Sequence, residues 1–158
     1  MGTIDRTTRT WMTAAAVAAV AGGVMWVGKQ VVIAASLPAG GGPPPESVPI
    51  AVLYLSGAAL MVLGASGVVA RLTAGWMLAL RVVAAVVLSP VIFWGVFTLT
   101  DMVCDAIAGP DAGWWWPGEG AILITALIFA AAGTATLFAL RSGARSVPDD
   151  GKKSAKVS

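Results

Sequence analysis

Four long apolar stretches alternate with short polar connections along the chain. They cover residues 11–37, 49–70, 76–102 and 121–140. A helix needs about 20 apolar residues to cross about 30 Å of hydrocarbon, so each stretch is long enough to span a membrane. The stretches are apolar on all sides rather than alternating every second residue, which favours helices over the strands of a barrel. The pattern predicts an all-α fold, an integral membrane four-helix bundle.

The connections contain residues that end helices. Residues 38–49 read PAGGGPPPESVP, and the consecutive prolines there do not continue a helix. Residues 71–75 form a short connection, which predicts a tight antiparallel helix pair. Residues 101–120 are acidic and contain the breakers Gly109-Pro110 and Pro117-Gly118. We divide the chain into an N-terminal segment (1–10), a four-helix transmembrane domain (11–141) and a polar tail (142–158), expected to be disordered.

The first span also resembles a secretory signal peptide, because basic residues precede it and Ala34-Ala35-Ser36 follows an apolar run. Two features favour a retained span instead. The apolar run is longer than a usual signal-peptide core, and Lys29 lies just before the cleavage position.

Composition agrees with a membrane protein and excludes several kinds of chemistry. Hydrophobic residues make up 58% of the chain and charged residues 11%, against about 45–50% and about 25% in soluble domains, so lipid is the expected solvent. The chain has no histidine, and Cys104 is its single cysteine. These counts exclude an internal disulfide and metal sites built from His and Cys clusters. We expect no enzymatic activity, no cofactor, no metal and no nucleic-acid partner.

Basic residues mark one side of the predicted membrane domain. Four spans place the N-terminus, the second connection and the tail together, and nine of the ten Lys and Arg residues fall on that side. Basic residues of short loops stay in the cytoplasm, so both termini are predicted to be cytoplasmic. The richness in Ala, Gly and Val suggests a bacterial source, which makes the bacterial cytoplasmic membrane the expected location. The nine residues are Arg6, Arg9, Arg71, Arg81, Arg141, Arg145, Lys152, Lys153 and Lys156.

Lys29 is the tenth basic residue and lies inside the first span. It is 18 residues from Trp11, or about 27 Å along a helix, which places it in the outer third of the bilayer. One interpretation is a lysine that snorkels to the headgroups. The other is an intramembrane ion pair with Asp101, or with Asp105 one turn later, because both aspartates reach a similar depth on the third span.

Two further features carry a structural and a functional interpretation each. Pro90 lies in the middle of the third span, where proline predicts a helix kink that serves as a bend or as a hinge. Trp114, Trp115 and Trp116 lie in the acidic third connection. Tryptophan prefers the headgroup level, so the triplet is predicted to be an interfacial anchor, with a docking patch as the alternative.

Small residues recur on single faces of three spans and predict close helix contacts. The sequence leaves open whether these contacts form within one chain or between chains. The rows are Ala15, Ala19 and Gly23; Gly57, Gly64 and Gly67; and Ala126, Ala130 and Gly133.

The favoured function is an accessory or structural membrane component that binds partners, or a second copy of itself, through its helices and outer loop. The alternatives are an oligomeric transporter or pore with Lys29 and Asp101 on a polar path, and a holin-like permeabilising protein. Small multidrug transporters also have four spans, but they use a glutamate in the first helix, where this chain has Lys29. Phage holins share the small size, the apolar spans and the basic tail.

Overall fold

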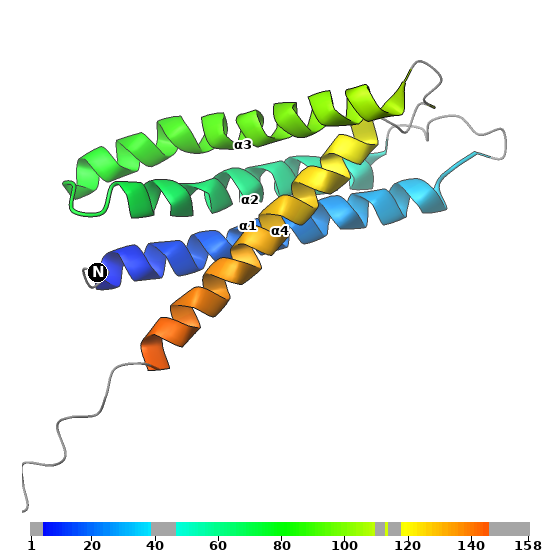
Figure 1. Cartoon of the computed structure of the whole chain (residues 1–158). Helices are drawn as coiled ribbons and strands as arrows, with labels where there is room; N and C mark the ends of the chain where they lie inside the picture. Colours follow the sequence, from blue (N-terminus) through cyan, green and yellow to red (C-terminus); the bar gives the residue numbers. More distant parts are fainter. Residues whose placement is uncertain (1–4, 39–46, 110–112, 114–117, 146–158) are drawn as a thin grey trace, which may run out of the picture.

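A computed structural model describes residues 5–38, 47–109, 113 and 118–145 of the chain. All secondary structure in this part of the chain is helical (Figure 1). Each of the four helices is long and apolar enough to cross a membrane. They are α1 (Arg6–Ala35), α2 (Val48–Leu72), α3 (Leu78–Ala108) and α4 (Gly118–Arg145).

Local sequence explains where several helices begin and end. Asp5 caps α1 because its carboxylate accepts a hydrogen bond from the backbone N–H of Thr8 at 2.6 Å. Pro49 lies in the first turn of α2, where a missing N–H does no harm. Gly75 turns the chain between α2 and α3 with φ of 94°, a left-handed conformation that favours glycine. The resulting turn is short, as the sequence predicts.

Most helix ends lie beyond the apolar stretches from which they were predicted, although α1 ends at Ala35 rather than at 37 and α3 begins at Leu78 rather than at 76. α3 continues to Ala108 rather than ending at 102, so Asp105 is helical as well as Asp101. α4 begins at Gly118, which places Glu119 in its first turn, and it ends at Arg145 rather than near 140. Hydropathy marks the apolar part of a helix, whereas the hydrogen-bonded turns continue into polar residues. The rest of the predicted tail, 146–158, and the tryptophans of 114–116 lie outside the described residues.

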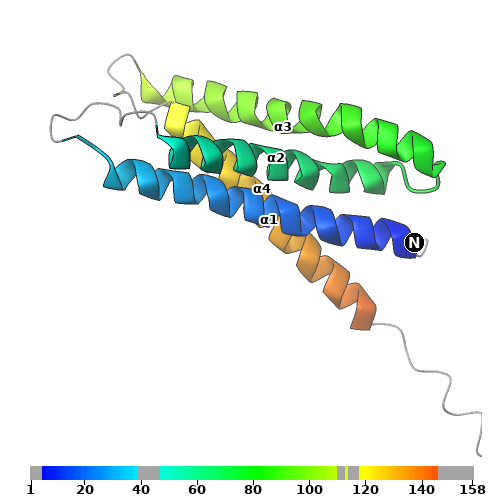
Figure 2. The same ribbon diagram turned by 180° about the vertical axis from the view of Figure 1, so that it is seen from behind.

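The four helices form a ring in which each packs against its sequence neighbours and α1 also packs against α4. Among these helices, α1 and α3 have no close backbone contact and lie opposite one another. The start of α1, the α2–α3 turn and the end of α4 share one end of the bundle (Figures 1 and 2). α4 crosses the other helices obliquely and diverges from α3 toward that end (Figure 1). We call it the basic end because it carries Arg6, Arg9, Arg71 and Arg141.

Small residues form the α1–α2 and α1–α4 interfaces within the chain. A Cβ added to Gly23 would lie 2.6 Å from the backbone oxygen of Ala126, and one added to Gly64 would lie 2.6 Å from the Cβ of Ala19. A Cβ added to Gly133 would likewise lie 2.6 Å from the backbone oxygen of Ala16. The three predicted rows are therefore helix contacts inside one chain.

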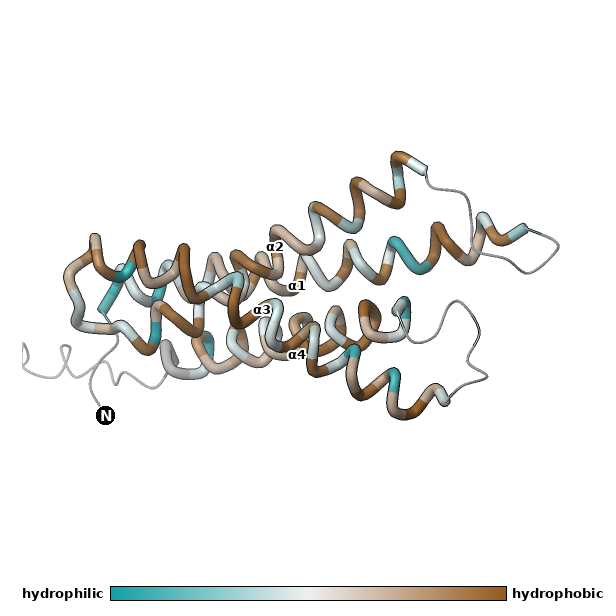
Figure 3. Tube along the Cα trace, turned by 90° about the horizontal axis from the view of Figure 1, so that it is seen from above, coloured by the Kyte–Doolittle hydropathy of each residue, from teal (hydrophilic) through white to brown (hydrophobic). Residues whose placement is uncertain are grey.

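The outer surface of the bundle is apolar, and one internal cluster of large side chains forms its core. Trp26, Met61, Phe93 and Phe129 are buried at its centre. Many large aliphatic side chains instead face outward along all four helices, and hydrophilic residues gather toward the two ends of the bundle (Figure 3).

Candidate functional site

The strongest polar cluster lies between α1 and α4, at the end opposite the basic end. The ammonium of Lys29 donates to both carboxylate oxygens of Glu119 at 2.7 Å. The two side chains are 6% and 19% exposed, so the pair is largely shielded from solvent. The side-chain amide of Gln30 donates to the same carboxylate at 2.6 Å. Glu119 lies in the first turn of α4, where the helix dipole favours a negative charge.

Aromatic side chains surround the lysine on its inner side. The Lys29 ammonium lies 5.3 Å from the ring centroid of Tyr54, within the range of a cation–π interaction. The Tyr54 ring stacks on Trp26, and the Trp26 indole N–H donates to the backbone oxygen of Tyr54 at 2.8 Å. Trp26 also meets the edges of Phe93 and Phe97 from α3. The aromatic cluster thus fills the bundle directly beneath the ion pair.

The partner of Lys29 differs from the one that the sequence predicted. Lys29 is buried, as an ion pair requires, but its carboxylate is Glu119 and not Asp101 or Asp105. Asp101 is half-buried and Asp105 is exposed on α3. Equal depth in the bundle does not make two residues neighbours, because their helices must also be adjacent. α3 lies opposite α1, whereas α4 lies beside it.

Glu119 escaped the sequence analysis because it was assigned to the third connection. A signal was present, since acidic residues are enriched in the first turn of a helix. The glycines on either side of Glu119 concealed that helix start, because glycine is a poor helix former.

A second polar cluster lies at the basic end and centres on Arg81. This arginine is 5% exposed, so it does not extend into solvent. One of its terminal nitrogens donates to the hydroxyl of Thr8 at 2.8 Å and to the backbone oxygen of Ala70 at 3.2 Å. Its guanidinium also lies 5.4 Å from the ring centroid of Trp11.

The capping residue Asp5 completes this second cluster. The backbone N–H and the hydroxyl of Thr8 donate to its carboxylate, and both bonds hold the pKa of Asp5 below its ordinary value of 3.8. Thr8 therefore connects the start of α1 to Arg81 of α3. The long side chain of Arg81 thus joins α3 to α1, although the backbones of these two helices are not in contact.

Pro90 lies inside α3, which continues through it as one helix. The neighbouring Ser89 is buried, and its hydroxyl has no hydrogen-bond partner among the described residues. A bend at Pro90 stays a prediction. Further along α3, the hydroxyls of Thr100 and Thr125 lie 2.7 Å apart and connect α3 to α4.

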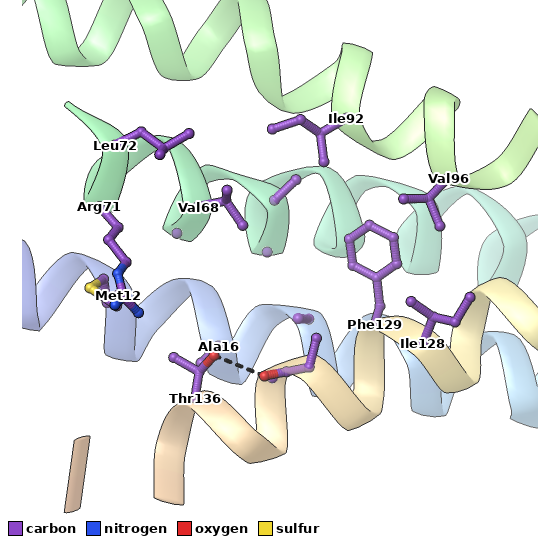
Figure 4. A pocket seen from close by; sticks show the side chains of 16 residues that line it. Met12, Ala16, Val68, Arg71, Leu72, Ile92, Val96, Ile128, Phe129 and Thr136 are labelled. Atoms are coloured by element: carbon purple, nitrogen blue, oxygen red, sulfur yellow. Dashed lines mark hydrogen bonds between the residues drawn. The ribbon is translucent and has the colours of Figure 1, made fainter. Parts of the chain in front are cut away.

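An apolar cavity of about 400 Å³ lies between the aromatic cluster and the basic end. All four helices line it, and its walls are mostly alanine, glycine and aliphatic side chains. Phe129 and Val96 lie toward one end, and Arg71 extends from α2 across the other end toward Met12 (Figure 4). Among the described residues, Arg71 is the one charged residue in the lining. The cavity has the size of a small-ligand site but contains few polar groups.

Three layers thus follow one another along the bundle: an ion pair, an aromatic cluster and an apolar cavity that ends at an arginine. An all-helical bundle with this apolar exterior is compatible with a small membrane protein. Comparison of the chain with known protein families, with curated proteins and with solved structures finds no match.

Proposed function

We propose that this chain is a multi-pass protein of the bacterial cytoplasmic membrane, with four spans and both termini inside. The distribution of apolar and charged side chains between the surface and the interior supports this proposal. Large aliphatic and aromatic side chains are exposed on the outside, among them Val24, Val86 and Trp94 at 54–69%. The charged side chains of Lys29 and Arg81 are buried inside. Water does not stabilise such an arrangement, whereas lipid does.

The orientation follows from the charges at the two ends. The basic end carries Arg6, Arg9, Arg71 and Arg141, and the opposite end carries Asp101, Asp105 and Glu119 on its helices. Basic residues near the ends of spans are retained in the cytoplasm, so we assign the basic end to the inner side.

Reporter fusions test this topology. Alkaline phosphatase, which is active only outside the cytoplasm, is fused after Pro38, Ala74, Gly113 or Ser142. We expect activity after Pro38 and Gly113 and none after Ala74 and Ser142. The same fusions to a fluorescent protein that folds only inside should give the reverse pattern. Extraction of the untagged protein from membranes by alkaline carbonate, or phosphatase activity after Ser142, contradicts the proposal.

We further propose that the protein acts without catalysis, as an accessory or structural component. The buried Lys29–Glu119 ion pair and the hydroxyl contact of Thr100 with Thr125 are both formed within the chain. α3 instead presents a continuous apolar surface on its outer face. That surface includes Val82, Val83, Val86, Val87 and Val91, all 46–69% exposed.

Site-specific photo-crosslinking in the native membrane tests partner binding through α3. A photoreactive residue at Val86 should give a discrete crosslinked protein, whereas one at Val24, equally exposed on α1, should give only lipid adducts. Equal lipid labelling from both positions contradicts a partner-binding role for α3.

A transporter or pore is the alternative, and the Lys29–Glu119 pair is the observation that favours it, because buried ionisable residues often lie on ion pathways. Flux into proteoliposomes that is lost in Lys29→Met would favour transport over the accessory role. Rapid lysis of cells on expression would favour a holin-like pore.

A further inference from the structure

The cavity next to the basic end is large and is lined mostly by apolar side chains. Its volume is about 400 Å³, far above that of a packing defect. The walls offer an ordered water few partners, so water is a poor filling. The walls therefore suit an occupant with an apolar surface.

The cavity is open toward the outside of the bundle. Val68 and Leu72 of α2 and Ile128 of α4 belong to the lining and are 44–73% exposed. The oblique course of α4 leaves α3 and α4 apart at this level (Figure 1). A chain lying in the surrounding hydrocarbon can enter from the side without crossing a helix.

The position and length of the cavity match one leaflet. Its lining on α1 extends from Met12 to Ala19, and on α4 from Ile128 to Thr136, which is about 10–12 Å along each helix. Half of a hydrocarbon core of about 30 Å is about 15 Å. The cavity thus occupies the depth of the inner leaflet and ends at the level of its headgroups.

Arg71 defines the chemistry at the open end. Its side chain crosses the end of the cavity (Figure 4) and forms no ion pair with any described residue. The acidic side chain described at this end is Asp5, which Thr8 already binds. Arg81 donates to the carbonyl of Ala70, one residue earlier, so a second guanidinium lies at the same end. This end attracts an anion.

We propose that the cavity binds one acyl chain of an anionic phospholipid from the cytoplasmic leaflet, and that Arg71 binds the lipid phosphate. An arginine fork and the planar face of a phosphate form paired, charge-assisted hydrogen bonds. A helix from a second copy fits less well, because a copy of the same topology brings its own basic end against Arg71. This inference rests on the proposed insertion into a membrane.

The headgroup is tested on the full chain extracted in mild detergent, by native mass spectrometry with added lipid. Phosphatidylglycerol and phosphatidylcholine with the same dioleoyl chains are compared. Wild type should bind phosphatidylglycerol about fivefold more tightly, as expected for one basic residue at the headgroup level. Arg71→Gln should abolish this preference. Arg141→Gln, an exposed arginine at the same end but outside the cavity, should retain it.

The acyl chain is tested by filling the cavity from two exposed lining positions. Val68→Phe and Ala132→Leu should each weaken binding of dioleoyl phosphatidylglycerol about tenfold, since displacing two methylene groups forfeits roughly that factor. Val17→Phe, at an exposed position of α1 outside the cavity, should leave binding unchanged. Dihexanoyl phosphatidylglycerol, which has the same headgroup and short chains, should bind more weakly to wild type.

Each opposite result overturns the inference. Equal binding of the two dioleoyl lipids removes the role of Arg71, and equal losses in Arg71→Gln and Arg141→Gln indicate diffuse charge attraction. Unchanged binding in both cavity variants places the lipid elsewhere. A lipid-free dimer that Val68→Phe separates makes a second copy the occupant. If the protein is absent from the membrane fraction, the proposed function itself fails, which is distinct from a membrane-inserted protein that binds no lipid.

Discussion

The Lys29–Glu119 pair makes a quantitative prediction that separates the structural partner from the one expected from sequence. Lys29→Met removes the ammonium and leaves the carboxylate of Glu119 with Gln30 and partial exposure of 19%. Breaking a buried ion pair from one side costs about 3–5 kcal/mol. Because Glu119 keeps one donor and some exposure, we expect the lower value, about 3 kcal/mol.

The reverse substitution should cost more. Glu119→Leu leaves the Lys29 ammonium buried, with the Tyr54 ring as its remaining described contact. We therefore expect a loss toward 5 kcal/mol. Replacing both residues with apolar ones removes the uncompensated charge, so the Lys29→Met/Glu119→Leu double variant should lose only about 1 kcal/mol.

The measurement is the free energy of unfolding in mixed micelles titrated with a denaturing detergent, combined as a double-mutant cycle. With these losses the Lys29–Glu119 coupling should be about 7 kcal/mol, well above the roughly 0.5–3 kcal/mol usual for residues in contact, because each single variant leaves an uncompensated charge. The matched control is Asp101→Asn with Lys29→Met, whose effects should add within about 0.5 kcal/mol. A cycle in which Lys29 couples to Asp101, and is additive with Glu119, would refute the pairing.

Three further predictions concern packing, capping and interhelical hydrogen bonds. Gly23→Ala should destabilise the bundle by about 1–3 kcal/mol, because its Cβ would meet a backbone oxygen of α4 at 2.6 Å. Gly28→Ala, whose Cβ meets nothing within 4 Å, should be neutral or stabilise by about 0.5–1 kcal/mol. The same unfolding titration measures both glycine variants, and equal effects would contradict the close contact at Gly23. Because the pKa of Asp5 is lowered in the folded state, its cap should protect the first turn of α1 fully at pH values above the unfolded pKa of 3.8. The protection should be lost as the pH falls through the folded pKa. Hydrogen exchange in wild type and Asp5→Ala should show this loss, and a difference between them that does not depend on pH would count against it. Thr125→Val should lower the free energy of unfolding by only about 0.6 kcal/mol, because the Thr100 hydroxyl still donates to the backbone oxygen of Phe97 in its own helix. A loss above about 2 kcal/mol would contradict this small contribution of the Thr100–Thr125 bond.

Local pattern was sufficient for the number and kind of helices. Four apolar stretches of adequate length, with proline and glycine between them, predicted the four helices formed by the described part of the chain. Burial against lipid or protein requires the same residue types, so hydropathy identifies the apolar part of each helix. It does not identify the polar turns at helix ends, which is why Glu119 was assigned to a loop.

Sequence alone was enough to identify the apolar segments, the concentration of basic residues at one end and the small residues that allow close helix contacts. Each of these depends on the identity and spacing of residues along one segment. The tertiary structure alone decided that Lys29 meets Glu119 rather than Asp101, and that α4 crosses obliquely and leaves a cavity beside Arg71. Both outcomes depend on which helices are neighbours and at what angle they pack. The complementary surfaces of four helices determine that arrangement together, and no single stretch of sequence encodes it.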